Sequence, residues 1–172
     1  NISTMLIDFL ANPTLNTDSI KSLESISGGG APLPEAVGEQ LLQLTGLKFV
    51  EGYGLSEAAP VVTSHKKGIE IKPGSVGIPI PGVELRIVDE NGEEVPAGVV
   101  GEIIVHGDNV TPGYYQNTGE TTRVLKDSWL FTGDLARIDD EGYVYIVDRK
   151  KDLIIRGGFN VYPRDVEEIL NA

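Results

Sequence analysis

The sequence feature that most constrains the fold is a change in the pattern of apolar residues near Gly68. Before this point, apolar residues at helical spacing alternate with short apolar runs that end in glycines, which is typical of α/β structure. After it, short apolar runs are separated by Pro-Gly and Asn-Gly pairs, which favour tight turns between strands. The sequence therefore predicts an α+β fold, in which a partial α/β subdomain precedes a small antiparallel β-barrel-like subdomain.

The first part is expected to contain two helices and two strands. Apolar residues recur at helical spacing over Ile2–Leu10. A short apolar run at 22–27 stops at three glycines, and Pro34 then opens a second helix that Gly46 ends. A strand is predicted at 48–51. This order of elements, with glycines at the strand ends, indicates α/β structure.

The remainder is expected to form a meander or barrel of short strands. Asp89–Gly92 and Asp139–Gly142 have the composition of hairpin turns, because their glycines suit positive φ angles. Pro163 suits the first turn of a final short helix. The expected strands are 83–88, 102–105, 129–138, 143–147 and 153–155.

Composition excludes several classes of function. Lys plus Arg is 14 and Asp plus Glu is 26, and the resulting net charge of −12 disfavours binding to nucleic acid or anionic membrane surfaces. The chain has no cysteine and only His65 and His106 as imidazoles, so a zinc or iron site is not expected. No stretch approaches the ~20 apolar residues of a membrane span. These features favour a cytoplasmic protein.

Two segments of the α/β part carry residue types suited to ATP. Gly28–Gly30 would leave backbone N–H groups open to a flat or anionic ligand, although such a run is also typical of a flexible turn. In the segment Gly52-Tyr53-Gly54-Leu55-Ser56-Glu57, the Tyr53 ring can stack on adenine and Ser56 can bond a phosphate oxygen. Glu57 offers an oxygen ligand for Mg²⁺. A core-edge Tyr53 and a solvated Glu57 are the alternative.

Two further segments suggest sugar recognition. Gly133-Asp134 interrupts an apolar β run, and the Asp134 carboxylate can accept two hydrogen bonds from a ribose 2′,3′-diol. A bare Gly-Asp pair is also typical of a turn. Further along, Arg149 could bring a guanidinium group to the same sugar or to a phosphate. Trp129, Tyr114 and Tyr115 are expected to pack in the β core or at strand edges.

Taken in order, four segments resemble the motifs of the adenylate-forming superfamily, which comprises acyl-CoA synthetases, luciferases and adenylation domains. They are Ser27–Leu33, Glu51–Glu57, Trp129–Leu135 and Asp148–Gly158. The resemblance is strongest to a fatty acyl-CoA ligase. Adenylation domains of peptide synthetases usually carry Lys in place of Ile155 and Pro-Thr-Glu in place of Leu55-Ser56-Glu57, and both departures favour a CoA ligase.

The resemblance implies ATP, Mg²⁺ and coenzyme A as cofactors and a carboxylic acid as substrate. It implies that residues 1–80 belong to the nucleotide-binding subdomain, 81–147 to the β-barrel-like subdomain and 148–172 to a hinge and the start of a C-terminal lid. Lys151 would be the hinge. The implied nucleotide contacts are Gly30, Ala31, Pro32, Gly52, Tyr53, Gly54, Ser56, Asp134 and Arg149, with Glu57 as catalytic metal ligand and Gly157 and Gly158 beside the pantetheine arm of CoA.

In this superfamily a phosphate loop precedes the matched region and a catalytic lysine follows it. We therefore expect the chain to be a piece of an acyl-CoA ligase and to have no ligase activity alone. Two alternatives remain open. The parent could be an aryl or amino-acid adenylating enzyme whose acceptor is a carrier protein, or the chain could be a β-rich binding module without catalytic function.

Overall fold

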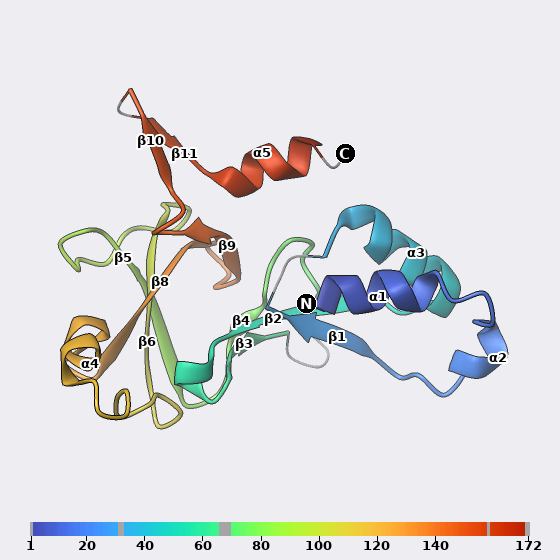
Figure 1. Cartoon of the computed structure of the whole chain (residues 1–172), viewed down its shortest axis with the longest axis horizontal. Coiled ribbons are helices and arrows are strands. Elements are labelled where there is room, and N and C mark those ends of the chain that lie inside the picture. The colour runs from blue at the N-terminus through green and yellow to red at the C-terminus, as the bar shows by residue number, and fades with distance from the viewer. Residues whose placement is uncertain (1, 31–32, 66–69, 158, 171–172) are drawn as a thin grey trace.

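The computed structural model describes residues 2–30, 33–65, 70–157 and 159–170. It contains two sheets that lie side by side, with a two-stranded hairpin and a helix projecting from the second sheet (Figure 1). The mixed α+β fold class that the sequence predicts is confirmed. Among the described residues, no helix has the length and apolar character needed to cross a membrane.

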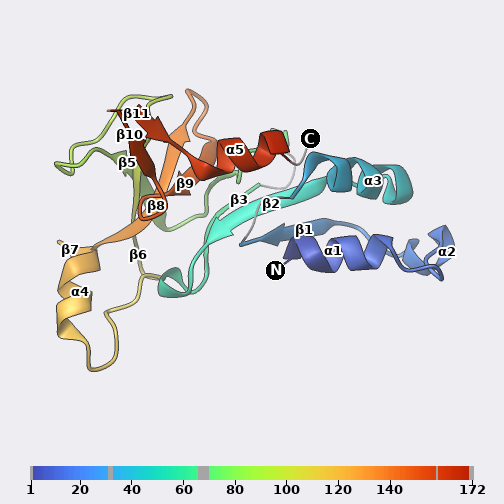
Figure 2. The ribbon, with the colours of Figure 1, turned by 45° about the horizontal axis from the view of Figure 1, so that its top comes forward.

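The first sheet has four strands in the order β1-β2-β3-β4. The strands β1 and β2 are parallel, and β3 and β4 continue the sheet antiparallel. The helices α1 and α3 lie beside one another and next to this sheet (Figures 1 and 2). The elements of this part are α1 (Ile2–Leu10), α2 (Thr17–Ile20), β1 (Ile26–Gly29), α3 (Glu35–Thr45), β2 (Phe49–Gly54), the 3₁₀ helix η1 (Ser56–Ala58), β3 (Val61–Ser64) and β4 (Ile78–Pro79).

The second sheet has five antiparallel strands in the order β5-β6-β8-β7, with β9 paired to β8. Its hairpin turns follow the sequence prediction, because Gly92 and Gly142 adopt φ angles of 84° and 86°. The elements are β5 (Val83–Val88), β6 (Gly101–Gly107), α4 (Thr118–Val124), β7 (Leu125–Lys126), β8 (Trp129–Ile138) and β9 (Val144–Arg149).

The last part comprises β10 (Ile154–Arg156), β11 (Phe159–Val161) and α5 (Pro163–Leu170). The two strands form a separate antiparallel hairpin, and α5 extends from it above the first sheet (Figure 2). Several of its apolar side chains face solvent, including Ile155 at 71% and Phe159 at 76% exposed. The strand β9 runs to Arg149, two residues beyond the expected end of the β subdomain at 147. The division into three domains stays a prediction.

A continuous core joins the two sheets. Val62 on β3 and Val76 pack with side chains of β5, β6, β8 and β9. The backbone adds two hydrogen bonds at this seam, from the Val76 N–H to the Val144 carbonyl at 2.9 Å and from the Val144 N–H to the Gly77 carbonyl at 2.8 Å. Burial of this kind supplies most of the drive for folding. The seam therefore fixes the relative position of the sheets, on which the site between them depends.

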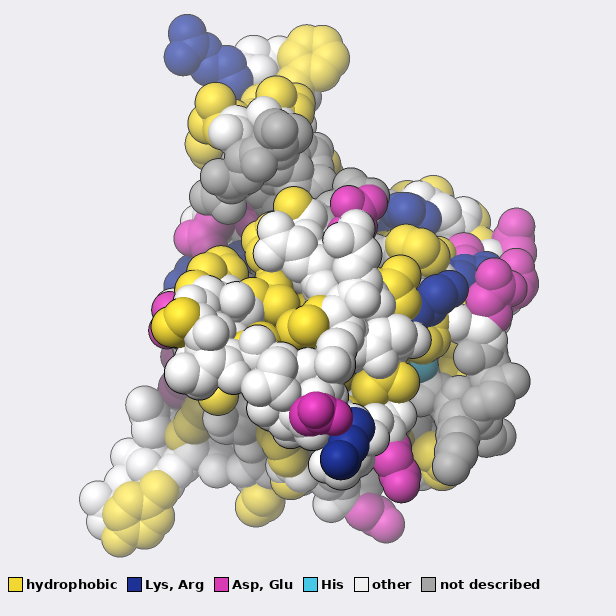
Figure 3. Space-filling model, turned by 90° about the vertical axis from the view of Figure 1, so that its right-hand side faces the viewer, with side chains coloured by type: hydrophobic (Ala, Val, Ile, Leu, Met, Phe, Trp, Pro, Cys, Tyr) yellow, Lys and Arg dark blue, Asp and Glu magenta, His cyan; other side chains and the backbone are white. Residues whose placement is uncertain are grey.

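The face formed by the N-terminal helices is less well buried. Hydrophobic side chains are visible on it (Figure 3), and Met5 and Ile7 of α1 are 67% and 46% exposed. Only Ile20 and Leu41 are buried among the described side chains of α1 to α3. The main core of the chain is thus at the seam between the sheets.

Several local predictions hold and others differ from the structure. The helix at Ile2–Leu10 is confirmed, and Gly46 ends α3 in a left-handed conformation with φ 71°. The strand predicted at 48–51 continues as β2 to Gly54, because Tyr53 pairs with Thr63 of β3. The helix α4 was not expected, although Asn117 caps it by accepting a hydrogen bond from the Glu120 N–H at 3.1 Å.

Candidate functional site

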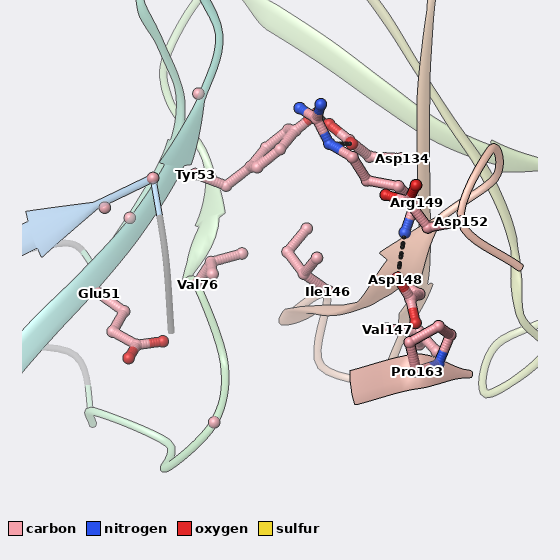
Figure 4. Close-up of a pocket in the computed structure, with 15 residues that line it drawn as sticks. Glu51, Tyr53, Val76, Asp134, Ile146, Val147, Asp148, Arg149, Asp152 and Pro163 are labelled. Atoms are coloured by element: carbon pink, nitrogen blue, oxygen red, sulfur yellow. Dashed lines mark hydrogen bonds and ion pairs between the residues drawn. The ribbon is translucent and has the colours of Figure 1, made fainter. Parts of the chain in front are cut away.

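A cleft of about 450 Å³ lies between the two sheets (Figure 4). One wall is the carboxyl end of β1 and β2, and the other is formed by β8, β9 and the turn after β9. Carboxyl ends of parallel strands are a common place for ligands in α/β folds. Its lining residues are Gly29, Gly30, Glu51, Gly52, Tyr53, Gly54, Gly74, Val76, Asp134, Ile146, Val147, Asp148, Arg149, Asp152 and Pro163.

Three polar side chains meet at one end of this cleft. The Tyr53 hydroxyl, from β2, donates a hydrogen bond to Asp134 Oδ2 at 2.7 Å. Arg149 Nε, at the end of β9, lies 3.1 Å from Asp134 Oδ1. The Tyr53 ring crosses the cleft towards this pair (Figure 4). Residues that the sequence analysis selected from three separate segments therefore converge on one carboxylate.

The protonation of this cluster follows from its surroundings. Burial, followed by the Asp134 charge, raises the pKa of the Tyr53 phenol far above its usual value. The phenol therefore keeps its proton and acts as the donor. Asp134 is almost buried, with a side chain 8% exposed, whereas the Arg149 side chain is 59% exposed. The outer part of the guanidinium thus faces solvent and is accessible to an anionic ligand.

An irregularity in the sheet places Asp134 in this position. Along β6 and β8, Ile104 pairs with Phe131 and Glu102 pairs with Leu135, so Thr132–Asp134 stand opposite a single residue. Gly133 adopts φ 74°, which favours glycine. Bulges of this kind redirect side chains at functional sites. The predicted interruption of the β run at Gly133-Asp134 is therefore present, as a bulge.

Glycines let backbone segments at the first wall approach each other closely. A Cβ on Gly29 would lie 2.5 Å from the Gly52 carbonyl oxygen, and one on Gly54 would lie 2.0 Å from the Pro60 carbonyl oxygen. Neither position has room for a side chain. By contrast, a Cβ on Gly30 would meet nothing within 4 Å. Glycine is favoured there because the backbone has a φ of 87°, which other residues rarely adopt.

Glu57 and Ser56 lie outside the set of residues that line the cleft. They belong to η1, and Glu57 Oε1 accepts a hydrogen bond from the Tyr114 hydroxyl at 2.8 Å. This bond, with burial second, raises the pKa of Tyr114. Among the described residues, Glu57 is thus placed beside Tyr114 and not in the lining of the cleft that contains Tyr53. The metal-ligand role of Glu57 stays a prediction.

The sequence did not predict the contact between Tyr114 and Glu57. Tyr114 was assigned to packing, and no spacing rule links it to Glu57, because the two meet through the fold. Tyr115, also assigned to packing, is 90% exposed, so that prediction is wrong. Trp129 lies on the sheet with the Arg86 guanidinium 4.4 Å from its ring centroid.

The remaining predicted residues lie towards the C-terminal end or outside the described residues. Lys151 is exposed in the turn after β9, next to the cleft residue Asp152. Gly157 turns the β10–β11 hairpin with φ 60° and open space at its Cβ position. Ala31, Pro32 and Gly158 lie outside the described residues.

The fold and the cleft together define a protein with a ligand site at the carboxyl ends of strands, lined by glycines and by an Asp-Arg-Tyr cluster. Residues 2–115 match the profile of the AMP-binding enzyme family. The chain belongs to this family.

Named relatives extend the comparison. The chain is 47% identical over 168 residues to a long-chain-fatty-acid–CoA ligase of Bacillus subtilis. This alignment covers 97% of the chain and 30% of that protein. The chain is 41% identical over 170 residues to a feruloyl-CoA synthase of an Amycolatopsis species, covering 98% of the chain and 34% of the relative. The chain spans about a third of the length of the curated relatives it matches.

A solved structure shares the fold. The ATP-bound crystal structure of MatB from Rhodopseudomonas palustris superimposes with a TM-score of 0.91 at 37% identity. The match covers 99% of this chain and 34% of that protein.

Proposed function

We propose that the chain is the adenosine-binding part of an ATP-dependent acyl-CoA ligase that forms AMP. The reaction has two steps: a carboxylate attacks the α-phosphate of ATP to give acyl-AMP and pyrophosphate, and the thiol of CoA then displaces AMP. The observation that carries the proposal is the convergence of Tyr53 and Arg149 on Asp134 in one cleft. The family match and the fatty-acid and feruloyl ligase relatives support the assignment.

In this proposal Asp134 holds the ribose. Each carboxylate oxygen has two lone pairs, so Oδ1 and Oδ2 can accept from the 2′,3′-diol while keeping Arg149 and Tyr53. Those two contacts fix the orientation of the carboxylate before the ligand arrives. Preorganised groups need little rearrangement on binding, which favours affinity and rate.

The Arg149 guanidinium and the glycine wall handle the phosphate and base. The exposed side of Arg149 can donate to a phosphate oxygen or to the ribose. The bare backbone of Gly29–Gly30 and Gly52 admits a flat ring against the strand ends. Val76 and Ile146, which also line the cleft, supply apolar contacts (Figure 4). The cleft thus combines a polar end for the sugar with an apolar surface for the base.

The metal that this reaction requires is assigned to Glu57. Mg²⁺ commonly binds nucleotide phosphates with one or two protein carboxylates and water. The described residues contain no group of three acidic, His or Cys side chains that could enclose an ion. In a Mg·ATP complex the protein supplies few of the metal ligands. The single Glu57 carboxylate, held by the Tyr114 hydroxyl, fits this requirement. When bound, Mg²⁺ supplies positive charge that offsets the charge developing on the phosphates.

Lys151 and Gly157 are assigned to the second step. Lys151 lies in the exposed turn between β9 and β10, and the proposal assigns the hinge of the lid to it. Gly157 adds no side chain at the tip of the β10–β11 hairpin, which leaves a narrow approach for the pantetheine arm of CoA. Gly158 and the adenine contacts of Ala31 and Pro32 remain part of the proposal.

Pyrophosphate exchange tests the proposed function. A protein that carries this chain together with segments matching the rest of the relatives is incubated with ATP, labelled pyrophosphate and a panel of fatty, aryl and amino acids. Exchange that depends on a fatty acid, followed by thioester formation with CoA, is the expected result. Dependence on an amino acid with transfer only to a carrier protein would favour the adenylation-domain alternative. Absence of exchange with every acid would contradict the proposal.

Two further measurements, acyl-CoA formation and nucleotide affinity, separate a binding module from a ligase. We expect the 172-residue chain alone to produce no acyl-CoA from ATP, CoA and fatty acids. Turnover by the chain alone would contradict this. If the chain is a binding module unrelated to adenosine, Asp134→Ala and Arg149→Ala leave nucleotide affinity unchanged, whereas the ligase proposal predicts a clear loss.

A further inference from the structure

Glu102 is a nearly buried carboxylate on β6 that lies outside the cleft lining but contacts the backbone behind it. The residue is 8% exposed. Its Oε1 accepts a hydrogen bond from the Gly133 N–H at 3.0 Å. Its Oε2 lies 2.8 Å from Lys150 Nζ. Buried carboxylates are rare unless they are paired and hydrogen-bonded, so these two contacts account for a charged group in this place.

The first contact stabilises the bulge that carries Asp134. In the register of β6 and β8, Thr132–Asp134 stand opposite Ile103 alone, and Gly133 has no partner residue on β6. The Glu102 carboxylate accepts the amide hydrogen of Gly133 in place of a strand carbonyl. On the N-terminal side of Gly133, the Thr132 hydroxyl donates a hydrogen bond to the Ile103 carbonyl of β6 at 2.9 Å. Side chains thus replace the ladder bonds that the bulge interrupts.

The second contact extends this support to the turn after β9. The Lys150 backbone N–H donates to the Gly133 carbonyl at 2.8 Å, while its ammonium group pairs with Glu102. Both backbone groups of Gly133 are therefore held, one by Glu102 and one by Lys150. Asp134 directly follows Gly133, and Arg149 directly precedes Lys150. The same closed set of contacts fixes the two residues that meet in the cleft.

We propose that Glu102 is a positioning residue for nucleotide binding: it holds the β8 bulge, with Lys150 as its counter-ion, so that Asp134 and Arg149 meet in the cleft. That the ligand is a nucleotide rests on the proposed function. The contacts of Glu102 with Gly133 and Lys150 do not depend on it. A further consequence concerns the hinge. Because Lys150 is tied to the sheet through both its backbone and its side chain, a pivot at Lys151 would start directly after a fixed residue.

The test compares three variants in AMP binding and in amide exchange at Gly133. Glu102→Ala removes both contacts, Glu102→Gln keeps an acceptor for Gly133 but loses the charge, and Lys150→Met removes the counter-ion. Affinity for AMP is measured by calorimetry, and exchange by NMR of the labelled chain. We expect Glu102→Ala to weaken AMP binding roughly tenfold to a hundredfold, since small displacements of site residues have effects of that size. Glu102→Gln should recover part of the loss.

Lys72→Met is the matched control. Lys72 Nζ lies 2.9 Å from Asp139 Oδ2 at the opposite end of the β8–β9 hairpin, so it has the same chemistry without contact to the bulge. We expect the AMP affinity of this variant and the amide exchange rate at Gly133 to equal those of wild type. If Glu102→Ala does not fold, Glu102→Gln and Lys150→Met carry the comparison, with faster exchange at Gly133 and weaker binding expected in Lys150→Met.

The outcomes separate the inference from the proposed function. If wild type binds AMP and the Glu102 and Lys150 variants bind it no less tightly than Lys72→Met, the positioning role is overturned. If wild type binds no adenine nucleotide, the proposed function fails, and exchange at Gly133 decides the geometric role: faster exchange in the Glu102 variants supports it, and unchanged exchange overturns it.

Discussion

Removing the Tyr53 hydroxyl tests the central cluster of the site most simply. Tyr53→Phe deletes the 2.7 Å hydrogen bond to Asp134 Oδ2 and leaves the ring in place. The acceptor is a carboxylate whose side chain is 8% exposed, so little solvent can replace the lost donor. Hydrogen bonds to charged groups contribute about 1.5–3 kcal/mol, and we expect a loss of unfolding free energy in that range.

The loss is measured by urea unfolding of the chain, followed by circular dichroism. In a thermal melt of the same chain, each kcal/mol corresponds to roughly 2–4 °C in Tm at this chain length, so a Tm shift of about 3–12 °C is expected. Tyr115→Phe is the matched control, because Tyr115 is 90% exposed and its hydroxyl accepts a hydrogen bond from the exposed Gln116 side chain at 3.2 Å. We expect its effect to stay within about 0.5 kcal/mol.

A double-mutant cycle assigns the energy to the pair. If Tyr53 and Asp134 interact as the structure indicates, Tyr53→Phe costs less in an Asp134→Asn background than in wild type. Equal effects of Tyr53→Phe and Tyr115→Phe on stability, or strict additivity with Asp134→Asn, would refute the reasoning.

Three further changes test other parts of the account. Gly54→Ala should destabilise the chain by more than about 3 kcal/mol in urea unfolding, because its Cβ would lie 2.0 Å from the Pro60 carbonyl oxygen. Tyr114→Phe should raise the Mg²⁺ concentration for half-maximal pyrophosphate exchange roughly tenfold, since it frees the predicted metal ligand Glu57. Burial works to raise the pKa of Asp139, but hydrogen bonds from a lysine and from backbone amides outweigh it and lower the pKa. Its contribution to stability is therefore present above the unfolded pKa and lost as pH falls, so Asp139→Asn should flatten the decline of unfolding free energy below about pH 4.

Each of these has its own contrary result. Gly38→Ala is the control for Gly54→Ala, because its Cβ would make only an ordinary 3.7 Å contact with Leu33. A comparable loss in both glycine variants would argue against a specific clash. An unchanged Mg²⁺ requirement in Tyr114→Phe would remove the support for Glu57 as metal ligand. If the unfolding free energy falls equally steeply at low pH in wild type and Asp139→Asn, carboxylates other than Asp139 cause the fall.

The sequence predicted the fold class and the break in the strand at Gly133-Asp134 because both depend on local patterns. The nucleotide-binding roles of Tyr53, Asp134 and Arg149 came from the resemblance to the adenylate-forming superfamily. The spacing of apolar residues that indicates the helix at Ile2–Leu10 involves only near neighbours in the chain. The same holds for the glycines of the hairpin turns. Gly133 and Asp134 were found because polar residues interrupt an apolar strand. These signals need no knowledge of which strands pair.

The parts that the sequence missed depend on distant residues. Tyr114 meets Glu57 only because the loop after β6 packs on η1, where the Thr111 N–H also donates to the Glu57 carbonyl at 2.8 Å. Glu102 contacts Gly133 only because β6 and β8 pair with a particular register. Register and loop packing are set by the tertiary fold, so no local motif reports them.

The most direct test of the account is discrimination between AMP and 2′,3′-dideoxy-AMP. If Asp134 accepts hydrogen bonds from the ribose diol, wild type should bind AMP at least tenfold more tightly, since one or two charge-assisted hydrogen bonds of about 1.5–3 kcal/mol are lost with the dideoxy ligand. Asp134→Ala should bind both ligands with similar, weaker affinity. Equal binding of the two ligands by wild type, or a preference for AMP that survives in Asp134→Ala, would contradict the assignment of this cleft to adenosine.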